Sequence, residues 1–162
     1  MNRDALLAQL GGRLVLLARL YRREMDSIFK PHGLTDATAF PLRYLAQAGQ
    51  PVGQARLAEL LAIEGPTLVR VLDQLMEAGL VERLADESDR RARLVRLTRQ
   101  GQRLNDAIEP ELSAMRARLF KGATEEDVRR TLKVLDHLQT NLDAYLAEPA
   151  DIRPRRTAAV PK

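Results

Sequence analysis

The sequence predicts a mainly α-helical protein that carries one small β-hairpin. Apolar residues recur at three- and four-residue spacing over most of the chain, which is the period of an amphipathic helix. Aromatic residues make up only 4% of the 162 residues, so the core must be built from Leu, Val and Ala, which favours helices. One stretch near the middle differs, because two short segments rich in Leu, Val and Arg flank a polar loop there.

A long helix is predicted at the beginning of the chain. Apolar residues repeat at helical spacing between residues 4 and 30, and the Pro-His-Gly sequence at 31–33 ends the helix. Thr35 then supplies an N-cap oxygen for a second helix that reaches about Gln47. A Gly- and Pro-containing break at residues 49–52 follows.

Two short helices around a tight turn come next. The first spans residues 54–62. Pro66 can occupy the first turn of the second helix, where its missing N–H costs nothing, and this helix reaches about Ala78. Gly79 stands where a left-handed C-terminal residue is wanted. Two helices of this length around residues 63–65 are typical of a helix-turn-helix.

A β-hairpin is predicted directly after these two helices. Its strands are residues 80–85 and 91–97, and its loop is residues 86–90. A hairpin in this place is the wing of a winged helix-turn-helix. The predicted fold class is therefore mainly α with a small β-hairpin wing, flanked by N- and C-terminal helices.

Two helices and a tail complete the chain. Thr98 can cap a helix over residues 99–120, which Pro110 can kink. The last helix begins at Thr124 with an acidic first turn, as the helix dipole favours, and extends to about Ala147. The remaining residues are rich in Pro, Ala and Arg without periodicity and are predicted to be disordered.

Composition excludes several kinds of site. There is no cysteine, which removes disulfides, thiol nucleophiles and thiolate metal ligands. The few serines lie in no nucleophile elbow, no Gly-rich phosphate loop is present, and His32 and His137 are too far apart to suggest a metal site. We therefore expect no enzyme activity, no cofactor and no metal. Neither a signal peptide nor a membrane span is apparent, so a cytoplasmic location is expected.

Positive charge is concentrated around the predicted hairpin. The formal net charge is +4 and the isoelectric point about 9.8, which is compatible with nucleic acid without demanding it. Residues 83–103 carry seven arginines against three acidic residues. A partner with a negative surface is the natural complement of this segment.

One run of the sequence resembles a known family. Residues 61–101 read LAIEGPTLVRVLDQLMEAGLVERLADESDRRARLVRLTRQG. This run is similar to the DNA-binding core of the MarR family of transcriptional regulators, and PTLVRVLDQL resembles the recognition helix of its SlyA branch. The resemblance implies a DNA-binding regulator, more often a repressor, that binds a palindromic operator as a homodimer. The order of helices agrees from about residue 5 to residue 147.

The resemblance also assigns roles to segments of the chain. Residues 1–34 would form an N-terminal dimerisation helix and residues 35–100 the DNA-binding lobe. Residues 101–147 would form C-terminal dimerisation helices, and residues 148–162 the tail. The terminal helices have narrow apolar stripes that so small a lobe cannot bury, which also favours a twofold dimer. The alternative is a helical bundle within one chain.

Specific residues follow as candidates for DNA contact. Arg70 would read bases in the major groove, where a guanidinium can bind guanine through two hydrogen bonds. Arg91 would enter the minor groove, and Arg90 would either contact a phosphate or make a structural contact within the protein. The same recognition face includes Pro66, Thr67 and Gln74, and either Asp73 or Asp89 could orient a wing arginine. The alternatives are solvated surface charges, or a winged helix that binds protein.

A ligand pocket is the last expectation. Relatives bind small anionic aromatic compounds between the dimer helices and the DNA lobe. Arg19 aligns with a carboxylate-binding position of the SlyA branch, and Ala39 and Arg43 align with other pocket positions. This chain departs from the family pattern there, because relatives have a His and a Trp. A small aromatic carboxylate is the expected effector. The alternative for Arg19 and Arg43 is a pair of surface salt bridges.

Overall fold

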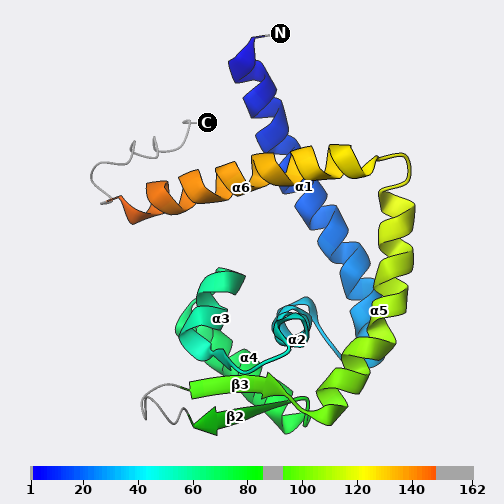
Figure 1. Cartoon of the computed structure of the whole chain (residues 1–162), viewed down its shortest axis with the longest axis vertical. Coiled ribbons are helices and arrows are strands. Elements are labelled where there is room, and N and C mark those ends of the chain that lie inside the picture. Colours follow the sequence, from blue (N-terminus) through cyan, green and yellow to red (C-terminus); the bar gives the residue numbers. More distant parts are fainter. Residues whose placement is uncertain (1, 86–92, 149–162) are drawn as a thin grey trace, which may run out of the picture. The chain divides into compact units, whose positions relative to one another are not determined.

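The computed structural model describes residues 2–85 and 93–148 (Figure 1). The chain divides into two compact units, Met1–Ala117 and Arg118–Lys162, and each is considered by itself. Asp89, Arg90, Arg91 and the C-terminal tail lie outside the described residues. None of the helices in the described ranges is long and apolar enough to cross a membrane.

The first helices begin and end at the residues that their capping chemistry favours. Helix α1 spans Arg3–Phe29, and a short 3-10 turn, η1, spans Lys30–His32. Helix α2 spans Asp36–Ala48 and begins with the predicted N-cap at Thr35. The Thr35 hydroxyl accepts a hydrogen bond from the Thr38 backbone, and the Thr38 hydroxyl accepts one from the Thr35 backbone.

The helix-turn-helix consists of α3, Gln54–Leu61, and α4, Gly65–Glu77. The turn between them passes through Ala62, whose φ of 51° is in the left-handed region. The backbone N–H of Ala62 closes the end of α3 by donating to carbonyls of the preceding turn. Both predicted helices are confirmed to within one residue at each boundary.

The sheet has three antiparallel strands rather than two. Strands β2, Val81–Ala85, and β3, Arg93–Leu97, form the predicted hairpin. A further strand, β1, consists of Val52–Gly53 and pairs with β3, giving the order β1-β3-β2. The sequence predicted only a break there, because two residues next to a proline carry no alternating pattern. The register places Val52 and Arg83 on either side of Val95.

The C-terminal helices are α5, Arg99–Leu119, and α6, Glu125–Ala147. Thr98 caps α5, because its hydroxyl accepts from the backbone N–H of Gly101 at 3.0 Å and donates to the carbonyl of Gly79 at 2.6 Å. The helix continues through Pro110 to its last residue. Helix α6 has a capping box between Thr124 and Asp127 and buries none of its side chains in the described structure.

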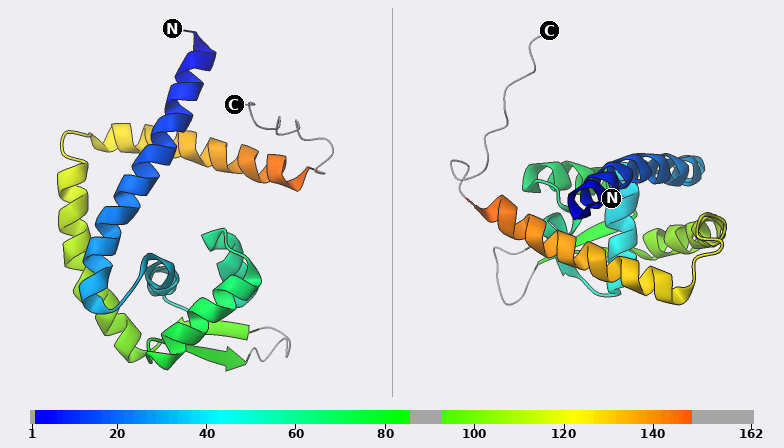
Figure 2. Two further views of the ribbon diagram at one scale, coloured as in Figure 1. Left: turned by 180° about the vertical axis from the view of Figure 1, so that it is seen from behind. Right: turned by 90° about the horizontal axis from the view of Figure 1, so that it is seen from above.

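The core of the first unit is built around α2. Figure 2 (left) shows α2 between α1 and α5 on one side and α3 and α4 on the other. Strand β3 also packs against α2. The fully buried side chains are mainly aliphatic, as the low aromatic content predicts: Phe29, Leu42, Leu57, Leu68, Leu72, Leu75, Val95, Ile108 and Leu112. This core holds α4 with one face outward.

Candidate nucleic-acid interface

Helix α4 has a strongly two-sided surface. Leu68, Val71, Leu72 and Leu75 are buried against the core. The exposed side chains include the four predicted contact residues: Pro66, Thr67, Arg70 and Gln74. They share the outer half of the helix because a helix advances about 100° per residue. An exposed, rigidly supported helix face of this size can enter a DNA major groove.

Arg70 lies near the middle of this exposed face. Its side chain is exposed, and none of the described residues forms an ion pair with it. A guanidinium without a protein partner keeps all five N–H donors for another molecule. Its predicted role in reading bases is therefore compatible with its surroundings.

An ion pair joins α4 to the hairpin. Arg83 Nη2 in β2 lies 2.9 Å from Asp73 Oδ1 in α4. The predicted alternatives were an orienting role for Asp73 or Asp89. In the described residues, the arginine that Asp73 holds is Arg83, on the first strand of the wing. This contact fixes the side of α4 that faces the hairpin.

The positive charge of residues 83–103 is smaller than the sequence count suggests. Arg83 is paired with Asp73, and Arg96 Nε lies 2.7 Å from Glu82 Oε1 on the neighbouring strand. Both acidic partners precede the counted segment, Asp73 in α4 and Glu82 directly before Arg83, so counting charges within the segment misses them. Arg93 is exposed at the start of β3. Arg99 and Arg103 lie in α5, so the described positive charge of this segment is divided between the hairpin and α5.

A cavity of about 400 Å³ lies among α1, α2, α3 and α4. Its walls are mainly apolar and include Phe40, Leu61 and Val71. One side carries an ion pair, Arg22 Nε to Asp36 Oδ2 at 3.2 Å. Burial raises the pKa of the Asp36 carboxyl, and Arg22 opposes that rise. The size is within the range of small-molecule sites in proteins.

The same cavity includes part of the candidate recognition helix. Thr67 and Val71 of α4 line it, opposite Arg22 of α1. Thr67 is exposed as well. A molecule in the cavity would therefore contact the helix that presents Arg70. Sequence patterns did not indicate this cavity, because its lining comes from four helices that are separate along the chain.

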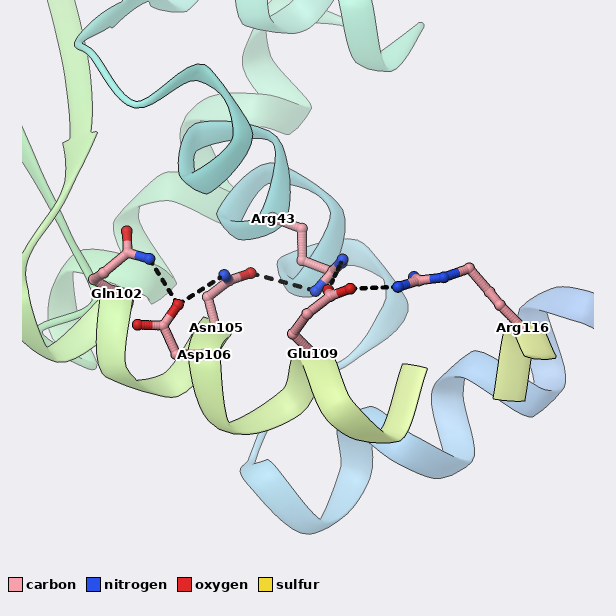
Figure 3. Close-up of polar contacts among 6 residues, drawn as sticks. All are labelled: Arg43, Gln102, Asn105, Asp106, Glu109 and Arg116. Atoms are coloured by element: carbon pink, nitrogen blue, oxygen red, sulfur yellow. Dashed lines mark hydrogen bonds and ion pairs between the residues drawn. The ribbon is translucent and has the colours of Figure 1, made fainter. Parts of the chain in front are cut away.

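The three predicted pocket residues do not come together. Arg19 lines a shallow hollow on the surface of α1 and the start of α2. Ala39 has no exposed surface, belongs to the core and is not among the residues that line the cavity. Arg43 is one helical turn after Ala39 and points to α5, where its Nη2 lies 2.6 Å from Glu109 Oε2 (Figure 3). For Arg43 the salt-bridge alternative describes the structure.

Glu109 is the centre of a polar network between α2 and α5 (Figure 3). Its second oxygen is paired with Arg116, and Arg43 also donates to Asn105 Oδ1 at 3.3 Å. The hydrogen bond from Arg43, reinforced by Arg116, lowers the pKa of the Glu109 carboxyl. The network links α2 to α5. Its contribution to the free energy of unfolding is small, because its members are partly exposed to water.

No cluster of three or more potential metal ligands occurs within the described ranges of the chain. His32 Nε2 lies 2.9 Å from Glu111 Oε1, in a contact between η1 and α5.

The fold and the exposed face of α4 together define a winged-helix protein of the DNA-binding class.

Comparison with known proteins identifies the family. The MarR family profile matches residues 32–92. The structure is similar to that of the transcriptional regulator PA3341, with a TM-score of 0.76 and 34% identity over 83% of this chain and 98% of that one. The chain belongs to the MarR family of winged-helix transcriptional regulators. The predicted family and fold class are thus confirmed.

Two further solved structures are informative. CouR from Rhodococcus jostii RHA1, bound to p-coumaroyl-CoA, gives a TM-score of 0.74 and 26% identity, covering 80% of this chain and 90% of that one. The apo form of wild-type MarR from E. coli gives 0.64 and 25%, covering 78% and 94%. The likeness therefore extends well beyond the residues matched by the family profile.

Proposed function

We propose that this protein is a repressor that binds a palindromic operator as a homodimer, with α4 of each chain in a major groove. The observation that carries the proposal is the exposed face of α4, where Arg70 stands without an ion-pair partner among the described residues. Arg91 would enter the adjacent minor groove, and Arg90 would contact the backbone. We also propose that the protein belongs to the SlyA branch of the family, because the segment PTLVRVLDQL resembles the recognition helix of that branch.

The test is to select DNA fragments with the purified protein and to titrate the selected duplex by fluorescence anisotropy. We expect binding at least about 1,000-fold tighter than to a scrambled duplex, with affinity that falls as salt rises, because phosphate contacts release counterions. Arg91→Ala should weaken binding by about 1–3 kcal/mol per half-site. Equal affinity for both duplexes would favour the alternative, a winged-helix module that binds protein.

The homodimer is supported by apolar surfaces on the terminal helices. Helix α1 exposes a series of aliphatic side chains, and α6, which buries none of its residues in the described structure, exposes another. On α1 these are Leu6, Leu7, Leu10, Val15, Leu16, Leu17 and Leu20; on α6 they include Val128, Leu132, Leu138 and Leu142. So many exposed aliphatic side chains on two helices are typical of a subunit interface. A second copy of the chain offers matching surfaces.

Light scattering at micromolar concentration should report twice the 18.2 kDa mass of one chain. The double variant Leu132→Glu/Leu138→Glu should reduce the mass towards one chain, because it places two charges in the proposed interface. Glu125→Gln, in the exposed first turn of the same helix, is the control and should leave the mass unchanged. A wild-type mass of one chain would contradict the dimer.

We further propose that a small aromatic carboxylate releases the protein from DNA. The cavity among α1–α4 can hold the ring, and Arg22 offers a guanidinium that a ligand carboxylate could share with Asp36. Arg19, in the adjacent hollow, stays a candidate. A ligand that contacts Thr67 would bind with different affinity to the DNA-bound and the free positions of α4. Such a difference in affinity is what couples ligand binding to DNA binding.

Salicylate titrated into the protein–operator complex should lower DNA affinity at least tenfold, a coupling of about 1.4 kcal/mol. Salicylamide, which has the same ring without the negative charge, should have a weaker effect. Arg22→Ala and Arg19→Ala, measured separately, identify the arginine that binds the carboxylate. If no acid in a broad panel releases DNA, regulation by ligand is wrong and the abundance of the protein sets occupancy.

A further inference from the structure

The exposed face of α4 includes one residue that does not match its polar neighbours. Val69 is 40% exposed, and it is the one large apolar side chain among the exposed residues of this helix, all of which the structure describes. Val69 is not among the predicted contact residues of this helix, which are small, polar or basic. The core positions of α4 are Leu68, Val71, Leu72 and Leu75 instead.

The neighbours of Val69 define where it points. It directly precedes Arg70 and lies one helical turn before Asp73. Residues four apart share a helix face, so Val69 is on the side of α4 that the Asp73–Arg83 ion pair turns towards the hairpin. Pro66, one turn earlier, is exposed next to it. Val69 is thus located beside Arg70, on the wing side of the exposed face.

The chemistry of the major groove offers a specific partner for this side chain. Thymine presents its apolar 5-methyl group there, whereas the polar groups of the base edges are hydrogen-bond donors or acceptors. We propose that Val69 contacts the methyl group of a thymine next to the guanine that Arg70 reads. The proposal rests on the proposed function, in which α4 enters the major groove.

Thr67 is the other side chain of this face with a methyl group that could contact thymine. Its position is different, because it lines the cavity together with Val71 and Leu61. Thr67 and Val69 are about 160° apart around the helix axis, so the two cannot contact the same base. The structure therefore assigns the methyl contact to Val69 and leaves Thr67 on the flank nearer α3.

Replacing single thymines of the selected operator by deoxyuridine removes the methyl group and leaves base pairing unchanged. Each half-site should contain one thymine that is sensitive to this replacement. When that thymine is replaced in a single half-site, we expect the affinity of the wild type to fall about fourfold, the effect of removing one buried methyl group. Val69→Ala should bind the thymine and uracil duplexes equally. Val69→Thr, which keeps one methyl on an isosteric side chain, should retain part of the preference.

Thr67→Ser is the control at the other candidate position, since it deletes the single methyl group of Thr67, whereas Val69→Ala deletes both γ-methyl groups of Val69. It should keep the fourfold preference for thymine. If the preference disappears in Thr67→Ser and persists in Val69→Ala, or if no thymine is sensitive to loss of its methyl, the assignment of Val69 is wrong. A protein that binds no duplex selectively would instead refute the proposed function. Thermal unfolding of each variant confirms that the comparison is made between folded proteins.

Discussion

Gly101→Ala should lower the free energy of unfolding by about 3 kcal/mol, at the upper end of the effect of overpacking. A Cβ atom at this position would lie 2.0 Å from the carbonyl oxygen of Leu80 and 3.0 Å from its carbonyl carbon. Both are backbone atoms, so no side chain can turn away to make room. Helix α5 must shift, or the chain leaving α4 must shift.

Neither movement is easy, because Leu80 is held from both sides. Its N–H donates to the carbonyl of Leu75 at 2.9 Å, and its carbonyl accepts from the N–H of Thr98 at 3.1 Å. The close approach of α5 to this segment therefore requires glycine. Alanine has the higher helix propensity by about 1 kcal/mol, so the expected net loss of about 3 kcal/mol is what remains of a larger steric cost after that gain.

Urea unfolding followed by circular dichroism measures this effect. Gly65→Ala is the control, because it makes the same change in the first turn of α4, where no atom lies within 4 Å of the added Cβ. The control should be neutral or more stable, by up to about 1 kcal/mol, because alanine gains helix propensity there without a steric cost. Equal midpoints for Gly101→Ala and wild type would show that α5 does not approach Leu80 as closely as described.

Arg70→Ala should remove most of the discrimination between operator and scrambled DNA. The loss expected for one bidentate contact to guanine is about 1–3 kcal/mol per half-site, and a dimer makes the contact twice. The fold should be unaffected, because Arg70 is exposed and forms no ion pair with a described residue. The variant separates loss of recognition from loss of stability.

Arg70→Lys distinguishes recognition from charge. Lysine keeps the positive charge but lacks the planar fork that binds guanine through two hydrogen bonds. We expect its affinity for scrambled DNA to match that of the wild type, while its affinity for the operator falls almost as far as that of Arg70→Ala. An operator affinity close to the wild type for both variants would exclude Arg70 from base reading and direct attention to Gln74.

The helices were predictable because their signals are local. The N-caps at Thr35, Thr98 and Thr124 and the apolar periodicity between them are properties of short segments. Strand β1 could not be predicted, since two residues become a strand only through pairing with Val95 and Leu94 of β3. The exposed face of α4 followed from periodicity, although Val69 on that face was not named among the contact residues.

The cavity and the fate of Arg43 depend on tertiary packing. The family resemblance suggested that Ala39 and Arg43 line a pocket. In the structure Ala39 belongs to the core, and Arg43 is paired with Glu109 of α5, a helix that is far from α2 along the sequence. Glu109 is 66 residues after Arg43, and no periodic pattern relates positions so far apart. The lining of the cavity is similarly distributed, so only the folded arrangement identifies Arg22 and Asp36 as neighbours.

The short strand β1 has a consequence for the DNA sites this protein can use. Strand β3 is bonded to β2 on one side and to β1 on the other, and β1 continues directly into α3. The base of the hairpin and the helix-turn-helix therefore move as one piece. In the proposed complex with DNA, the distance along the duplex between the contact made by α4 and a contact made from the base of the hairpin is then set by the fold. One inserted base pair displaces the second contact by about 3.4 Å and rotates it by about 35°. Natural sites should consequently differ from one another by substitutions within each half, and not by insertions or deletions.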